Sequence, residues 1–183
     1  LRTGGDFCTL AFSTEEYRRD TEDCFFLNPQ NAEDFQLLLR DVDVTGKGFG
    51  GIVYCWGLDA KAPTLSAESI EALSIDGCSG LLFLLQALGR EVVANSPGLW
   101  LVTENAAPCS HGAARRHNRE LNLAQSPLWG MGKIAALEYP ELRCKRLDID
   151  AAAADVQAGK LAAELRSTSA GEDQVAVRGD GRY

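Results

Sequence analysis

Short apolar segments alternate with helical segments along most of this sequence, and this alternation limits the folds that the chain can adopt. Six segments are predicted to be β-strands: Phe7–Phe12, Cys24–Leu27, Gly51–Trp56, Leu99–Thr103, Arg143–Ile149 and Gln174–Val177. Parallel strands joined by helices are covered on both faces, so we predict a three-layer α/β domain with a mainly parallel sheet. The 183 residues suffice for one such domain to bury an apolar core without disulfides or metal ions.

Two of the predicted helices carry a single apolar stripe, as expected for helices that cover one face of a sheet. The first is capped by Asn31, and the second begins near Ala152. Their stripe residues are Phe35, Leu38, Leu39 and Val42 on the first helix and Leu161, Ala162 and Leu165 on the second. Each of these helices needs only one buried face.

Two other helical segments, Cys78–Leu88 and Leu128–Leu137, are apolar nearly all the way round. One face of each can cover the sheet, and the opposite face then needs a second chain or a missing half of the same domain. The chain also opens on Leu1–Gly5, which resembles a helix closing on glycine, and a further strand is predicted to begin at Gly181–Tyr183. We therefore expect a fragment of a longer polypeptide.

Charge and hydropathy argue against nucleic-acid and membrane partners. The net charge is −8, and no cationic cluster is longer than Arg115–Arg116, so the surface repels polyanions. No stretch approaches the about 18 uncharged apolar residues of a membrane helix, and the first residues lack the layout of a signal peptide. We expect a cytoplasmic protein.

The six cysteines are scattered without a C-x-x-C pair, which favours free thiols that behave as small apolar side chains over a disulfide or metal role. They are Cys8, Cys24, Cys55, Cys78, Cys109 and Cys144. We therefore predict no metal site.

The motifs of nucleotide-dependent reductases are missing or incomplete. Thr45–Gly51 has the glycines of a phosphate-binding loop, but a strand follows it where such a loop requires a helix, so we interpret it as a flexible connection. No tyrosine is followed four residues later by a lysine, the pair that lets short-chain reductases protonate a carbonyl. Trp129 and Lys133 have this spacing, but an indole cannot supply the proton.

The remaining candidates for acid–base chemistry have simpler interpretations. His111 and His117 lie in the polar segment Asn105–Ser126, where we expect solvent-exposed side chains. Asp148 and Asp150 follow a strand and could be paired carboxylates, although solvation or capping of the next helix is the simpler explanation. We predict no catalytic and no cofactor-binding residue.

Three segments of the chain resemble the structural subdomain of ketoreductase domains in modular polyketide synthases, and they occur in the family's order. They are Gly51–Ala60 (GIVYCWGLDA), Leu99–Ala106 (LWLVTENA) and Gln125–Leu142 (QSPLWGMGKIAALEYPEL), followed by Asp173–Ala176 and Gly181–Tyr183. The resemblance extends from about Asp23 to Tyr183. It implies that residues 1–183 form one truncated Rossmann-like subdomain, without the family's first strand.

The resemblance also implies a function without catalysis. In the family, NADPH and the Tyr, Ser and Lys catalysts belong to a second subdomain, which this chain lacks and would stabilise for β-ketoacyl reduction. The two subdomains mimic a short-chain reductase dimer, so the implied interface lies on the two helices with surplus apolar surface. The predicted interface residues are Leu81, Leu82, Leu85, Leu128, Trp129 and Lys133. Other implied partners are neighbouring dehydratase, enoylreductase or methyltransferase, and acyl carrier protein domains.

Two alternatives remain open at this point. The chain could be a pseudo-ketoreductase scaffold in a module that contains a methyltransferase or an enoylreductase. It could instead be a free-standing NADPH-dependent short-chain reductase whose catalytic residues are unrecognised. A dinucleotide-binding enzyme should carry a glycine-rich turn directly after its first strand, and we find none in this sequence.

Overall fold

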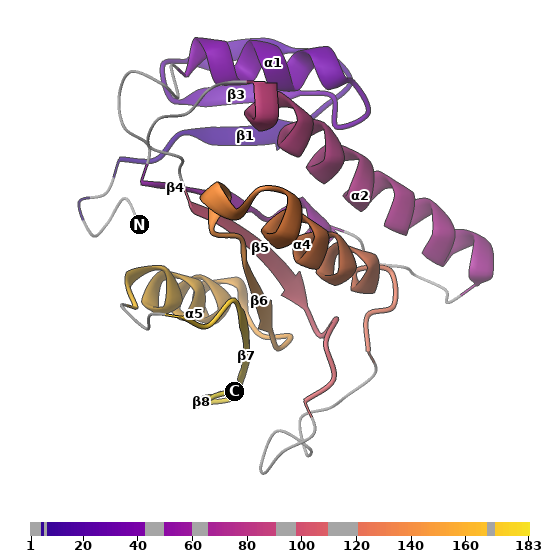
Figure 1. Ribbon diagram of the computed structural model, residues 1–183, viewed down its shortest axis with the longest axis vertical. Helices are drawn as coiled ribbons and strands as arrows, with labels where there is room; N and C mark the ends of the chain where they lie inside the picture. Colours follow the sequence, from indigo (N-terminus) through magenta and orange to yellow (C-terminus); the bar gives the residue numbers. More distant parts are fainter. Residues whose placement is uncertain are drawn as a thin grey trace. The chain divides into compact units, whose positions relative to one another are not determined.

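The computed structural model describes residue 5 and residues 7–42, 50–59, 66–90, 98–109, 121–167 and 171–183 (Figure 1). The chain divides into two compact units. One comprises Leu1–Gly50 and Cys78–Pro97, and the other comprises Gly51–Gly77 and Gly98–Tyr183. Each unit is described by itself.

The first unit contains a small mixed sheet. Its strands are β1 (Leu10–Ser13), β2 (Arg18–Thr21) and β3 (Cys24–Leu27), in the order β1-β3-β2. Strand β1 runs parallel to β3, whereas β2 runs antiparallel to it. The sequence predicted β3 at its observed bounds and β1 three residues early. It missed β2, because the four residues of this strand are polar and exposed.

Helix α1 (Ala32–Asp41) follows β3 and contacts it. The Asn31 side chain accepts a hydrogen bond from the Glu33 N–H at 3.1 Å, which confirms the predicted cap. Phe35 and Leu39, two members of the predicted stripe, are buried. The apolar spacing of this helix was therefore a reliable guide to its buried face.

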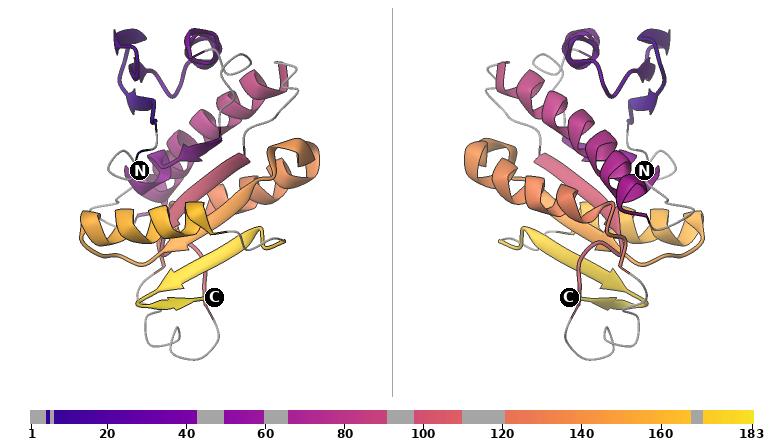
Figure 2. Two further views of the ribbon diagram at one scale, coloured as in Figure 1. Left: turned by 90° about the vertical axis from the view of Figure 1, so that its left-hand side faces the viewer. Right: turned by 90° about the vertical axis from the view of Figure 1, so that its right-hand side faces the viewer.

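The second unit contains a five-stranded sheet, which confirms the predicted mainly parallel arrangement. Its strands are β4 (Gly51–Tyr54), β5 (Gly98–Glu104), β6 (Lys145–Ile149), β7 (Gln174–Arg178) and β8 (Gly181–Arg182). They lie side by side in sequence order; β4 to β7 are parallel, and β8 is antiparallel to β7. Figure 2 shows this sheet between helices.

Helices of the second unit cover both faces of its sheet. Leu161 of α5 (Ala154–Arg166) packs against an apolar cluster formed by Val102, Leu147, Ile149 and Val175. On the opposite face, Gly132 of α4 (Ser126–Glu138) lies against Leu101 and Arg146. Because neighbouring residues of a strand point to opposite faces, these contacts place α4 and α5 on different sides of the sheet.

Among its described residues this unit also has two short 3-10 helices, η2 (Trp56–Asp59) and η3 (Pro140–Leu142). Helix α2 (Ala67–Arg90) contributes residues to both units and is longer than the predicted Cys78–Leu88. Its first turns escaped prediction because Glu68, Glu71 and Asp76 interrupt the apolar pattern.

Helix α2 is also long and apolar enough to cross a membrane by length and composition, which the sequence analysis did not expect. Core helices of soluble proteins meet the same criterion, so this property alone is weak evidence for a membrane span.

All six cysteines are free thiols. Burial raises the pKa of the Cys55 thiol and of the Cys144 thiol to about 11. Both thiols are therefore protonated at neutral pH, and a protonated thiol is a poor nucleophile and a poor metal ligand.

Candidate functional site

The carboxyl ends of the parallel strands are where ligand-binding sites of this class of sheet occur. In open α/β sheets, ligands bind there at the point where the strand order reverses. In the five-stranded sheet that the structure describes, the order β4-β5-β6-β7 never reverses. The described sheet therefore has no crevice of this kind.

Asp148 of β6 instead organises a buried polar network at this edge. Its side chain is 0% exposed and forms an ion pair with Arg178, which is buried as well. The carboxylate also accepts hydrogen bonds from the Thr103 hydroxyl, from the Ala106 N–H at 2.9 Å and from the Ala107 N–H at 3.1 Å. The backbone that follows β5 is thereby fixed to β6 and β7.

Arg178 completes the network from the other side. Its guanidinium donates to the Asp148 carbonyl at 2.8 Å and to the Ala107 carbonyl at 3.0 Å. A buried charge is tolerated only when it is paired and hydrogen-bonded, and this pair meets both conditions. The prediction that Asp148 is solvated or caps a helix is therefore wrong, because a cation 30 residues away in the sequence binds it inside the sheet edge.

Asp150 has partners of its own, so the two aspartates are not an acid–base pair. Its carboxylate binds Lys160 and accepts from the Gly179 N–H at 2.7 Å. Burial favours a higher pKa for Asp150, but the hydrogen bonds from Lys160 and Gly179 and the Lys160 charge hold the pKa below its usual value. The capping interpretation is wrong here too, since the residue at the α5 N-cap is Ala153, which makes no side-chain cap.

Trp129 and Lys133 lie one turn apart near the start of α4. Lys133 is exposed, whereas Trp129 is half-buried. The centre of the Trp129 ring lies 5.8 Å from the guanidinium carbon of Arg146, within range of a cation–π contact. Arg146 is buried and forms an ion pair with Asp173. The indole therefore packs against a buried cation.

The predicted interface residues differ in exposure, and Trp129 is half-buried. Leu81, Leu85 and Leu128 are buried within the chain, so their side chains are not available to a partner. Leu82, at 43% exposure, and Lys133 are exposed. The interface itself stays a prediction.

The predicted interface did not include the more exposed apolar residues of α4. These are Ile134, which is 59% exposed, and Leu137, which is 80% exposed. Together with the exposed Pro127 and Gly130 they recur every three or four residues, as residues on one face of a helix do. This spacing was the signal in the sequence that could have identified the exposed face of α4. Leu128 points away from them, toward Gly57 and Gly77.

Two predictions fall on residues outside the described ranges. His111 and His117 are among these residues, so their solvent exposure stays a prediction. The same holds for the conformation of the glycine-rich segment from Thr45 to Phe49. Strand β4 begins at Gly51, as the sequence predicted for the segment after these glycines.

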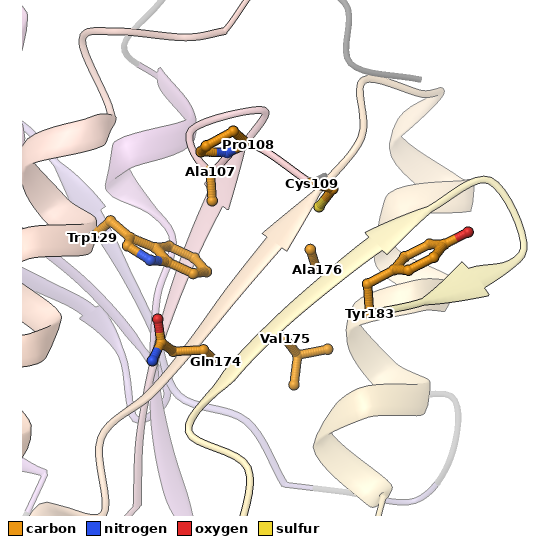
Figure 3. A pocket seen from close by; sticks show the side chains of 8 residues that line it. All are labelled: Ala107, Pro108, Cys109, Trp129, Gln174, Val175, Ala176 and Tyr183. Atoms are coloured by element: carbon orange, nitrogen blue, oxygen red, sulfur yellow. The ribbon is translucent and has the colours of Figure 1, made fainter. Parts of the chain in front are cut away.

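A cavity of about 290 Å³ lies beside the polar network, above β7 (Figure 3). It is lined by Ala107, Pro108, Cys109, Trp129, Gln174, Val175, Ala176 and Tyr183. Trp129 and Tyr183 stand on opposite sides of it, and strand β7 runs between them. The volume is below the roughly 300 to 1,000 Å³ of most small-molecule sites. Among the described residues, no group of three or more His, Cys, Asp and Glu side chains could hold a metal ion.

Comparison with known proteins finds similarity to parts of polyketide synthases. Residues 54–183 match the family described as the Rossmann fold domain of the polyketide synthase extender module SpnB. Polyketide synthase GfsA from Streptomyces halstedii is 38% identical over 107 residues, which cover 58% of this chain and 1% of that protein. The chain thus spans a very small part of this curated relative.

Solved structures share the fold. A multidomain structure of a keto acid-selecting NRPS module, with adenylation, ketoreductase and pseudo Asub parts, has a TM-score of 0.77 at 17% identity, and the match covers 96% of this chain and 14% of that one. A structure of A-type ketoreductases from a modular polyketide synthase has a TM-score of 0.63 at 23% identity, over 87% of this chain and 32% of that one. At these identities the structures bear on the fold alone, and they confirm a Rossmann-like fold.

Proposed function

The chain belongs to the family of Rossmann fold domains found in the polyketide synthase extender module SpnB, and we propose that it is the non-catalytic structural subdomain of a ketoreductase. In this role it stabilises a separate catalytic subdomain, which holds NADPH and reduces a β-ketoacyl group. The fold and the family place the chain in the ketoreductase region of a modular polyketide synthase. The division of labour between two subdomains is our proposal.

The observation that carries this proposal is that residues of the chain itself occupy the carboxyl edge of the sheet. Where a Rossmann enzyme leaves space and free amides for a nucleotide, this chain directs the amides of Ala106 and Ala107 to its own Asp148. Arg178 and Thr103 use further acceptor positions of the same carboxylate. A carboxylate with these partners is a poor general base, because its lone pairs are already engaged.

The exposed apolar residues of α4 support a docking role. Ile134 and Leu137 offer their side chains to solvent on the helix face opposite Leu128. We propose that the catalytic subdomain of the same polypeptide covers this face. Neighbouring synthase domains are further partners in this proposal, and the cytoplasm is the proposed location.

Titration with NADPH tests the division of labour. The 183-residue chain is expected to leave the fluorescence of the nicotinamide unchanged up to millimolar protein, whereas a synthase polypeptide with both subdomains is expected to enhance it. The measurement is emission of reduced nicotinamide at fixed NADPH. Saturable binding to the 183-residue chain, together with reduction of a ketone, would contradict the proposed function and favour a free-standing reductase.

A charge placed on the exposed face of α4 tests docking. In a polypeptide with both subdomains, Leu137→Asp is expected to lower the rate of ketoreduction about tenfold, because it buries an unpaired carboxylate at the interface. The matched control is Val156→Asp on α5, on the other face of the sheet, where the native side chain is 46% exposed. Equal rates for the two variants would count against docking through α4.

A further inference from the structure

We draw no further inference here: the strongest candidate, the cavity above β7 between Trp129 and Tyr183, lies at the edge of the sheet next to β8, and nothing in the structure shows what covers it.

Discussion

Replacing Asp148 by alanine is expected to lower the free energy of unfolding by about 3 to 5 kcal/mol, the usual cost of removing one partner of a buried ion pair. The Arg178 guanidinium would stay buried without its counter-ion. The amides of Ala106 and Ala107 and the Thr103 hydroxyl would lose their acceptor as well. Urea unfolding followed by circular dichroism measures the change.

Two further variants identify the cause of this loss. Asp180→Ala removes an exposed carboxylate from the turn between β7 and β8 and is expected to change stability by less than about 0.5 kcal/mol. Combining Asp148→Leu with Arg178→Met removes both charges and is expected to recover only the part of the loss that comes from the unpaired Arg178 charge, because the Ala106 and Ala107 amides and the Thr103 hydroxyl still lack their acceptor. An Asp148→Ala protein as stable as the Asp180→Ala protein would show that the network contributes little.

Replacing Gly132 by alanine is expected to destabilise the chain by about 1 to 3 kcal/mol, although alanine is the better helix former. A Cβ atom at this position would lie 2.7 Å from the Cγ and Cδ atoms of Arg146 and 2.8 Å from Leu101 Cδ1. Both neighbours are buried, so neither can move aside cheaply. The midpoint of urea unfolding is expected to fall accordingly.

The same helix provides the control for this substitution. Gly130 lies two residues earlier on the exposed side of α4, and a Cβ atom there would have no neighbour within 4 Å. Gly130→Ala is therefore expected to stabilise the chain by up to about 1 kcal/mol through helix propensity alone. If the two alanine variants shift the midpoint in the same direction, close packing of α4 on Arg146 is not what requires glycine at position 132.

The strands of the parallel sheet could be predicted because their signal is local. Strands β4 and β5 are mostly apolar, whereas β6 contains the charged residues Lys145, Arg146 and Asp148. Even so, β5 and β6 were placed to within two residues of their observed starts. Strand β8 has only two residues, Gly181 and Arg182, and offers no such run. The start of a further strand was nevertheless predicted at Gly181–Tyr183, where β8 lies, whereas β2 carried no local signal.

The candidate site could not be predicted, because its contacts join distant parts of the sequence. Alternation placed Asp148 on one face of a strand, but nothing local to it indicated Arg178 as its partner. The sequence likewise did not show which residues of α4 face inward and which face outward. Counting apolar residues marked Leu128 as readily as Leu137, and only packing against Gly57 and Gly77 shows which of the two is turned inward.

The order of the large sheet also bears on how the chain reaches its native state. Each of the strands β5 to β8 lies beside the strand that precedes it in the sequence, so a ribosome would deliver the strands of this sheet in the order in which they pair. When each new strand is synthesised, the strand with which it pairs has already been synthesised. No strand has to be inserted later between two strands that already lie in the sheet. A module of this kind is suited to vectorial assembly within a very long polypeptide.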